Sequence, residues 1–226
     1  MSVVVLVRHG RTTANATGVL AGWTADVHLD DVGTDQAEVV GQRLAPLALS
    51  AIVASPLERT QETAAAIAAA QRRPPTVTLD DRVGECAYGE WTGRALKDLA
   101  REPLWKTVQA RPSAVTFPDG ESMLHMQQRA VAAIHEWNER VGPRGLYVVV
   151  SHGDVIKSIL CDALGMHLDT FQRIVVDPAS VSVVRYTKDG SSVLRMNDMA
   201  SDLSDLAIAR RRRTSAAAVG GGSGQR

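Results

Sequence analysis

Two histidines follow runs of apolar, mostly β-branched residues in similar contexts, VVVLVRHGR near the start and YVVVSHGDV much later. Each run predicts a buried strand, which would place His9 and His152 at strand ends. In open α/β sheets, ligands bind in the crevice beyond the carboxyl ends of the strands. The glycines that follow, Gly10 and Gly153, would let the backbone turn sharply and approach a ligand. This repeated pattern predicts one site that contains both imidazoles.

Three arginines are expected to lie close to these two histidines. Arg8 and Arg11 flank His9, and Arg59 stands one turn into the helix that should follow a third strand, AIVAS. Guanidinium groups match the oxygens of a phosphoryl group. The formal net charge is zero at pH 7, so attraction for an anion must be local rather than a property of the whole molecule. A phosphate or phosphoryl group is therefore the expected ligand.

The elements that position these residues follow from apolar runs and helical periods, which predict an α/β fold with a mostly parallel sheet. We expect strands near Val3–Val7, Ala51–Ala54, Thr76–Leu79 and Leu146–Val150, and helices near Thr34–Leu47, Pro56–Gln71, Glu121–Arg140 and Asp154–Leu164. The second helix has a capping-box spacing from Ser55 to Glu58, with proline at the first helical position. This pattern predicts its start.

The C-terminal part of the chain carries a hairpin signal. VSVVRY and SVLRMN flank Lys188-Asp189-Gly190, which predicts antiparallel edge strands and a mixed sheet. The segment SVSVVRY could pair across a homodimer. Length favours one domain, 1–199. Residues 200–226 are rich in Ala, Ser and Gly, contain the run Arg210–Arg213 and are expected to form a disordered tail.

Composition argues against several classes of protein. The two cysteines, Cys86 and Cys161, lie far apart and form no CxxC, so neither a disulfide framework nor a zinc site is indicated. Val3–Val7 is too short for a signal peptide or a membrane span. We therefore expect a cytoplasmic protein with no membrane partner. With no net charge, no nucleic-acid partner is expected either.

Five ordered motifs, spread over residues 3–187, resemble a known family. They are Arg8-His9-Gly10 with Thr12 and Asn15, Ser55-Pro56 with Arg59-Thr60, Glu85, the stretch GEWTG at Gly89–Gly93, and Ser151-His152-Gly153. Together they resemble the histidine phosphatase superfamily, in its phosphoglycerate-mutase-like branch, which includes actinobacterial phosphatases. The resemblance implies a three-layer α/β sandwich whose mostly parallel central sheet has antiparallel edge strands.

The resemblance also implies a mechanism. His9 would attack phosphorus and form a phosphohistidine that water hydrolyses. Arg8, Arg59 and His152 would bind the phosphoryl oxygens. Glu85 would act as general acid and then as base, which requires a raised pKa such as partial burial could provide. The implied activity is that of a histidine acid phosphatase-type phosphomonoesterase acting on small-molecule phosphate esters, with no cofactor and no metal.

Substrate-binding residues are expected around these groups. Candidates are Gly10, Arg11, Thr12, Asn15, Ser122 and Gly153. Arg11 stands where the family often has glutamate, so it would add positive charge at the mouth and favour more anionic substrates. Ser122 lies in the stretch PDGES, which resembles the family segment that borders the pocket mouth.

Three alternatives remain open from the sequence. A phosphoglycerate-mutase-type phosphotransferase would use the same site, although GEWTG resembles the phosphatase version of that motif. A module that binds phosphorylated ligands without turnover would need no nucleophile, and the presence of both His9 and Glu85 argues against it. A nucleic-acid adaptor would act through Arg210–Arg213, but short charge runs in tails are usually just solvated.

Overall fold

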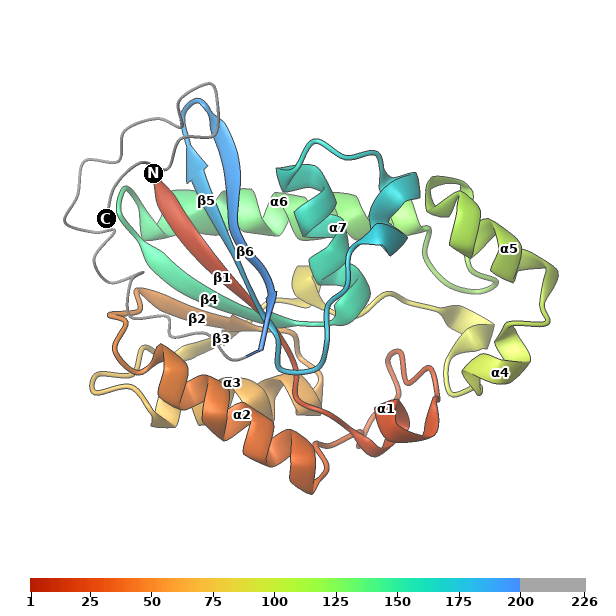
Figure 1. Ribbon diagram of the computed structural model, residues 1–226, viewed down its shortest axis with the longest axis horizontal. Helices are drawn as coiled ribbons and strands as arrows, with labels where there is room; N and C mark the ends of the chain where they lie inside the picture. Colours follow the sequence, from red (N-terminus) through yellow and green to blue (C-terminus); the bar gives the residue numbers. More distant parts are fainter. Residues whose placement is uncertain (200–226) are drawn as a thin grey trace.

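The computed structural model describes residues 1–199, and Figure 1 shows a central sheet between helices on both faces. The strands are β1 Ser2–Arg8, β2 Ala51–Ala54, β3 Val77–Leu79, β4 Leu146–Ser151, β5 Val181–Thr187 and β6 Gly190–Asp198. The α-helices are α1 Thr13–Thr17, α2 Asp31–Leu44, α3 Glu58–Ala69, α4 Leu96–Leu99, α5 Pro103–Ala110, α6 Met123–Val141 and α7 Gly153–Ala163. The expected α/β fold is confirmed.

Strand order explains why the two histidines meet. Within residues 1–199 the sheet has the order β3-β2-β4-β1-β5-β6. The first four strands are parallel, whereas β5 and β6 run antiparallel to their neighbours, as the hairpin signal predicts. In the pairing of β1 with β4, Arg8 lies opposite Ser151. His9 and His152 therefore leave adjacent parallel strands side by side.

Alternation along β1 divides the core into two halves. Val4 and Leu6 pack on the side of α6 and α7, and Val5 and Val7 pack on the side of α2 and α3. All four side chains are fully buried. Burial of each such side chain contributes about 1.5–3 kcal/mol. Packing on both faces thus fixes the strand whose end carries His9.

All four expected helices begin one to three residues away from the prediction, and the caps of α2 and α3 show why for those two. Helix α2 begins three residues earlier than expected, because the Asp30 carboxylate caps it by accepting from the Gly33 N–H at 2.8 Å. Helix α3 begins at Glu58, and its N-cap residue Leu57 makes no side-chain cap. The capping box expected from Ser55 is therefore wrong.

The segment SVSVVRY lies inside the sheet rather than at its edge. Its strand β5 pairs with β1 on one side and β6 on the other, so β6 is the edge strand. The expectation that two copies pair through this segment is therefore wrong, because both sides of β5 are already paired. Whether the chain forms a homodimer in another way stays a prediction. The tail at 200–226 lies outside the described residues. Within residues 1–199, no helix is long and apolar enough to cross a membrane.

Candidate active site

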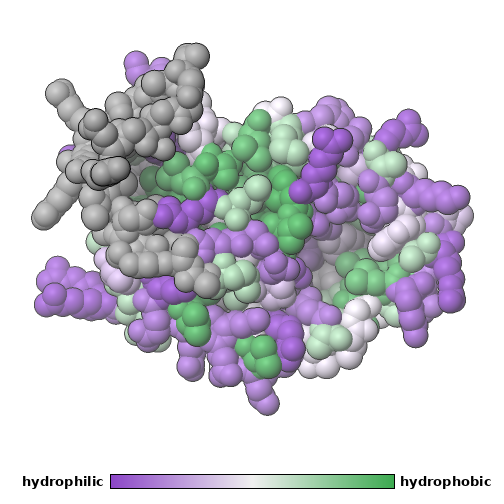
Figure 2. Space-filling model, in the orientation of Figure 1, coloured by the Kyte–Doolittle hydropathy of each residue, from purple (hydrophilic) through white to green (hydrophobic). Residues whose placement is uncertain are grey.

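A cavity of about 310 Å³ opens beyond the carboxyl ends of β1 and β4. This is within the size range of small-molecule sites. Seven of the expected residues line it: Arg8, His9, Thr12, Asn15, Arg59, Glu85 and Gly153. In Figure 2 the surface is hollowed on the side of α4 and α5, with hydrophobic surface beside the hollow. The predicted crevice therefore exists.

His9 is held in the form that a nucleophile requires. Its Nδ1 lies 2.7 Å from the Gly10 carbonyl oxygen, which can only accept, so Nδ1 carries the proton and Nε2 keeps its lone pair. Burial lowers the pKa of His9 well below its usual value, and the guanidinium groups of Arg59 and Arg8 lower it further. The imidazole is therefore neutral at neutral pH.

Two arginines that line the cavity have unused donors, the buried Arg59 and the half-buried Arg8. Arg8 Nη1 donates to the Val176 carbonyl at 2.7 Å, and Arg59 Nη2 donates to the Gly22 carbonyl at 2.8 Å. Arg8 Nε and Arg59 Nη1 are buried without a hydrogen-bond partner among residues 1–199. Buried donors without partners are costly, and an oxyanion bound between them would satisfy both.

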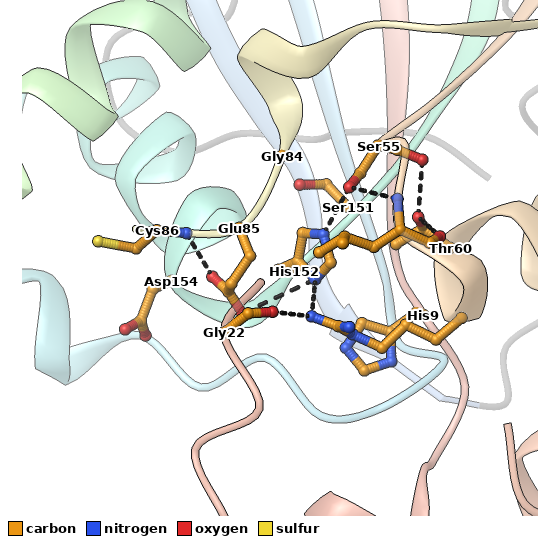
Figure 3. A network of polar contacts seen from close by, with 12 residues as sticks. His9, Gly22, Ser55, Thr60, Gly84, Glu85, Cys86, Ser151, His152 and Asp154 are labelled. Carbon is orange, nitrogen blue, oxygen red and sulfur yellow. Dashed lines mark hydrogen bonds and ion pairs between the residues drawn. The ribbon is translucent and has the colours of Figure 1, made fainter. Parts of the chain in front are cut away.

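His152 lies behind the cavity wall and is completely buried. Arg59 Nη2 lies 3.4 Å from its Nδ1, which must accept because a guanidinium can only donate. The opposite nitrogen, Nε2, therefore carries the proton and donates to Ser55 Oγ at 2.8 Å. Burial lowers the pKa of His152, and Arg59 adds to the effect. Figure 3 shows His152 between Ser55 and Glu85, with His9 close by.

Glu85 can hold a proton at neutral pH. Burial raises its pKa to about 7, helped by the charge of Asp154 and opposed by that of Arg59. Its Oε1 accepts from the Cys86 N–H at 2.9 Å, and its Oε2 lies 3.7 Å from His152 Nδ1. The carboxyl group beside His152 thus has the raised pKa that the expected acid–base role requires.

Arg129 fixes the loop that carries Glu85, and sequence reasoning missed it. From α6, it donates to the carbonyl oxygens of Arg82 and Gly84, both at 2.8 Å, and to that of Glu85 at 2.9 Å. It also forms a 2.6 Å ion pair with Glu121. No local motif signals this role, because all of these partners except Glu121 lie more than forty positions away.

If Glu85 is the acid that the family resemblance implies, replacement of Arg129 by Met should lower kcat for alkyl phosphate esters by about 10²-fold, since small displacements of an acid cost this much. The loss should be smaller for p-nitrophenyl phosphate, whose leaving group needs no proton. Steady-state kinetics on both esters measures this contrast. Arg140→Met, on the same helix but paired with Glu136, is the matched control. Equal losses on both esters would indicate general destabilisation instead.

Thr12 and Asn15 cap α1 and line the cavity. Thr12 Oγ1 accepts from the Asn15 N–H at 3.2 Å, while Asn15 Oδ1 accepts from the Thr12 N–H at 3.1 Å. The Asn15 amide nitrogen takes no part in this cap. The cap of α1 therefore leaves the two Asn15 N–H donors unused.

Arg11 is not part of the cavity lining. Its Nε forms a 2.9 Å ion pair with Asp30, the residue that caps α2. The expectation that Arg11 adds free positive charge at the mouth is therefore wrong. We expect Arg11→Gln to leave the relative kcat/KM values across a panel of phosphate esters unchanged. A shift of preference toward less anionic esters would contradict this assignment.

Gly10 and Ser122 also lie outside the cavity lining. The Ser122 hydroxyl caps α6 by accepting from the His125 N–H at 3.1 Å, so its side chain is used structurally. A Cβ at Gly10 would lie 2.3 Å from the Gly33 carbonyl oxygen. The backbone of Gly10 thus approaches α2 rather than a ligand, which corrects its expected role.

The outer cavity wall contains residues that the sequence did not assign to the site. Trp91 and Trp105 both line the cavity. Six further residues line this wall: Leu20, Tyr88, Phe117, Asp154, Lys157 and Gln172. They come from loops and short helices, whose positions local sequence patterns do not determine.

Cys86 and Cys161 are buried free thiols. Within residues 1–199, no group of three or more His, Cys, Asp or Glu side chains could hold a metal ion.

Comparisons with known proteins agree with this geometry. Residues 4–199 match the histidine phosphatase superfamily (branch 1). Phosphoserine phosphatase 1 of Hydrogenobacter thermophilus is 31% identical over 205 residues, which cover 87% of this chain and 92% of that protein. The probable phosphoglycerate mutase GpmB of Yersinia pestis is 33% identical over 189 residues, covering 82% and 86%.

Among solved structures, YhfR of Bacillus stearothermophilus superposes with a TM-score of 0.81 at 25% identity, covering 88% of this chain and 98% of that one. Sequence, site geometry and fold agree. The chain belongs to the histidine phosphatase superfamily and is an enzyme of the phosphatase and phosphotransferase type.

Proposed function

We propose that this enzyme hydrolyses small-molecule phosphate monoesters without a metal, through a phosphohistidine on His9. One observation carries the proposal. A neutral His9 shares the cavity with two arginines that each leave a buried nitrogen without a partner among the described residues. His9 would be the nucleophile, the two arginines would bind the oxyanion, and Glu85 would supply a proton in the same cavity.

In the first step, the lone pair of His9 Nε2 forms a bond to phosphorus as the bond from phosphorus to the ester oxygen breaks. Arg8 and Arg59 hold the phosphoryl oxygens and stabilise their charge in the transition state. The protonated Glu85 carboxyl transfers its proton to the departing oxygen, so the leaving group departs as a neutral alcohol.

In the second step, water attacks the phosphohistidine. The Glu85 carboxylate takes a proton from the water as the new bond to phosphorus forms. The bond between phosphorus and Nε2 then breaks, and its electron pair returns to His9. Inorganic phosphate leaves, and Glu85 is again protonated for the next turnover.

Phosphate release in the presence of excess EDTA tests the function. We expect the wild-type enzyme to hydrolyse p-nitrophenyl phosphate under these conditions and to convert 3-phosphoglycerate mainly to glycerate and phosphate. Rearrangement of 3-phosphoglycerate without phosphate release would instead favour a mutase, as the name of the Yersinia pestis relative suggests. Binding of phosphate with no turnover of any ester would favour a module that binds phosphorylated ligands without hydrolysing them.

A further inference from the structure

We propose that the outer half of the cavity binds an uncharged leaving group with a flat apolar ring. The preferred substrates are then phosphate monoesters of ring-bearing, uncharged alcohols rather than of carboxylated alcohols such as glycerate or serine. The inference rests on the proposed function and names its substrate class.

The first observation is a continuous aromatic wall, defined here as Tyr88, Phe117, Trp91 and Trp105, all of which line the cavity. Neighbouring rings contact one another along it. Tyr88 and Phe117 meet edge to face at 5.1 Å, Phe117 and Trp91 at 5.3 Å, and Trp91 stacks on Trp105 at 6.1 Å. Such a wall favours a flat, apolar partner.

The second observation is where the aromatic wall begins. Tyr88 Oη lies 3.4 Å from Glu85 Oε1 and donates to Asp154 Oδ2 at 2.9 Å. In the proposed mechanism, Glu85 protonates the leaving oxygen, so the rest of the leaving group must start beside Tyr88. From there the wall runs through Trp91 to Trp105 on α5. The leaving group, rather than the phosphoryl group, therefore lies against the aromatic wall.

The third observation concerns charge. Apart from the groups assigned to phosphoryl transfer, the charged side chains that line the cavity are Asp154 and Lys157. Lys157 Nζ is paired with Asp154 Oδ1 at 3.5 Å and lies 3.3 Å from Gln172 Oε1. Among the described residues, 1–199, a substrate carboxylate would find no uncompensated cation here and would lie beside Asp154. Desolvation of a carboxylate without a partner is unfavourable.

A panel of primary-alcohol esters tests the inference on the wild-type enzyme. We would measure kcat/KM for 2-phenylethyl phosphate, ethyl phosphate, O-phosphoserine and 3-phosphoglycerate. Their leaving groups carry a ring, neither ring nor charge, a carboxylate with an ammonium, and a carboxylate with a hydroxyl, respectively. The phenylethyl ester should exceed each of the others by about 10-fold or more, the scale of discrimination in an apolar pocket.

Two variants of the cavity wall sharpen the test. Trp105→Ala should reduce the preference for 2-phenylethyl over ethyl phosphate by about 10-fold, mainly through KM. Leu104→Ala is the matched control, because Leu104 is the neighbouring residue on α5, packs on the core and does not line the cavity. Leu20→Lys adds a cation to the wall and should shift the preference toward 3-phosphoglycerate.

The outcomes separate the inference from the function. Efficient hydrolysis with O-phosphoserine or 3-phosphoglycerate preferred would overturn the inference and leave the phosphatase assignment intact. Hydrolysis without any preference for the ring, or an equal change in Leu104→Ala and Trp105→Ala, would also overturn it. Failure to hydrolyse any ester, p-nitrophenyl phosphate included, would remove the proposed function and the inference together.

Discussion

Replacement of His9 by Ala should lower phosphatase turnover by about 10⁴-fold or more, the scale of loss when a hydrolase is deprived of its covalent nucleophile. The reason is that His9 Nε2 is the proposed atom that bonds to phosphorus, and alanine offers no substitute. Initial rates of phosphate release measure the loss. His167→Ala is the matched control, since its side chain is 70% exposed and is absent from the cavity lining.

A folded but inactive His9→Ala protein should still bind an oxyanion. Arg8 and Arg59 remain in place, and their buried nitrogens still need a partner. Inorganic phosphate binding, measured by calorimetry, therefore distinguishes loss of the nucleophile from loss of the fold. Turnover within tenfold of the wild type would exclude His9 as the nucleophile.

Replacement of Glu85 by Gln should lower the hydrolysis of alkyl phosphate esters by roughly 10²–10⁴-fold, because glutamine cannot donate a proton to the leaving oxygen. The loss should be smaller for p-nitrophenyl phosphate, which leaves without protonation. An equal loss on both esters would contradict the acid role. Glu90→Gln is the matched control, an exposed carboxylate in the following turn.

The pH profile gives a second signature of Glu85. Because its pKa is about 7, the fraction of protonated acid falls above that pH. The kcat/KM for an alkyl ester in the wild type should therefore decline on the alkaline side with an apparent pKa near 7. This alkaline limb should be absent in Glu85→Gln. Its persistence there would assign the titration to another group.

The same shift affects stability. The folded-state pKa of Glu85 lies above its ordinary value of 4.5, so its contribution to stability is fully present below about 4.5 and is lost as pH rises through about 7. Glu85→Gln removes this penalty. The change in the free energy of unfolding caused by Glu85→Gln should therefore be about 2–4 kcal/mol more favourable at pH 8 than at pH 4.5. Denaturant unfolding at the two pH values measures the difference.

Much of this site follows from local sequence because its central residues sit at strand ends. The runs before His9 and His152 are long enough to predict strands, and parallel pairing then places both residues at one edge. Arg59 follows from its place after a third strand, and the family resemblance adds Glu85; the structure brings both to the same cavity. Strands were therefore easier to place than helix starts.

What could not be predicted depends on partners distant in sequence. Ser55 has the spacing of a helix cap, but its hydroxyl instead accepts from His152, almost one hundred residues away. Arg11 stands two residues after the proposed nucleophile, His9, yet it is paired with Asp30. Arg129 has no motif of its own and acts through carbonyl oxygens of a remote loop. Each of these roles exists only once the chain has folded.

The most direct test of the account is to trap the covalent intermediate. The wild-type enzyme would be mixed with excess p-nitrophenyl phosphate, quenched rapidly in base, in which phosphohistidine survives, and digested for mass spectrometry. We expect one phosphoryl group on the peptide that contains His9, and none on the same peptide from His9→Ala. Phosphate release without any label on His9, or with the label on another residue, would contradict it.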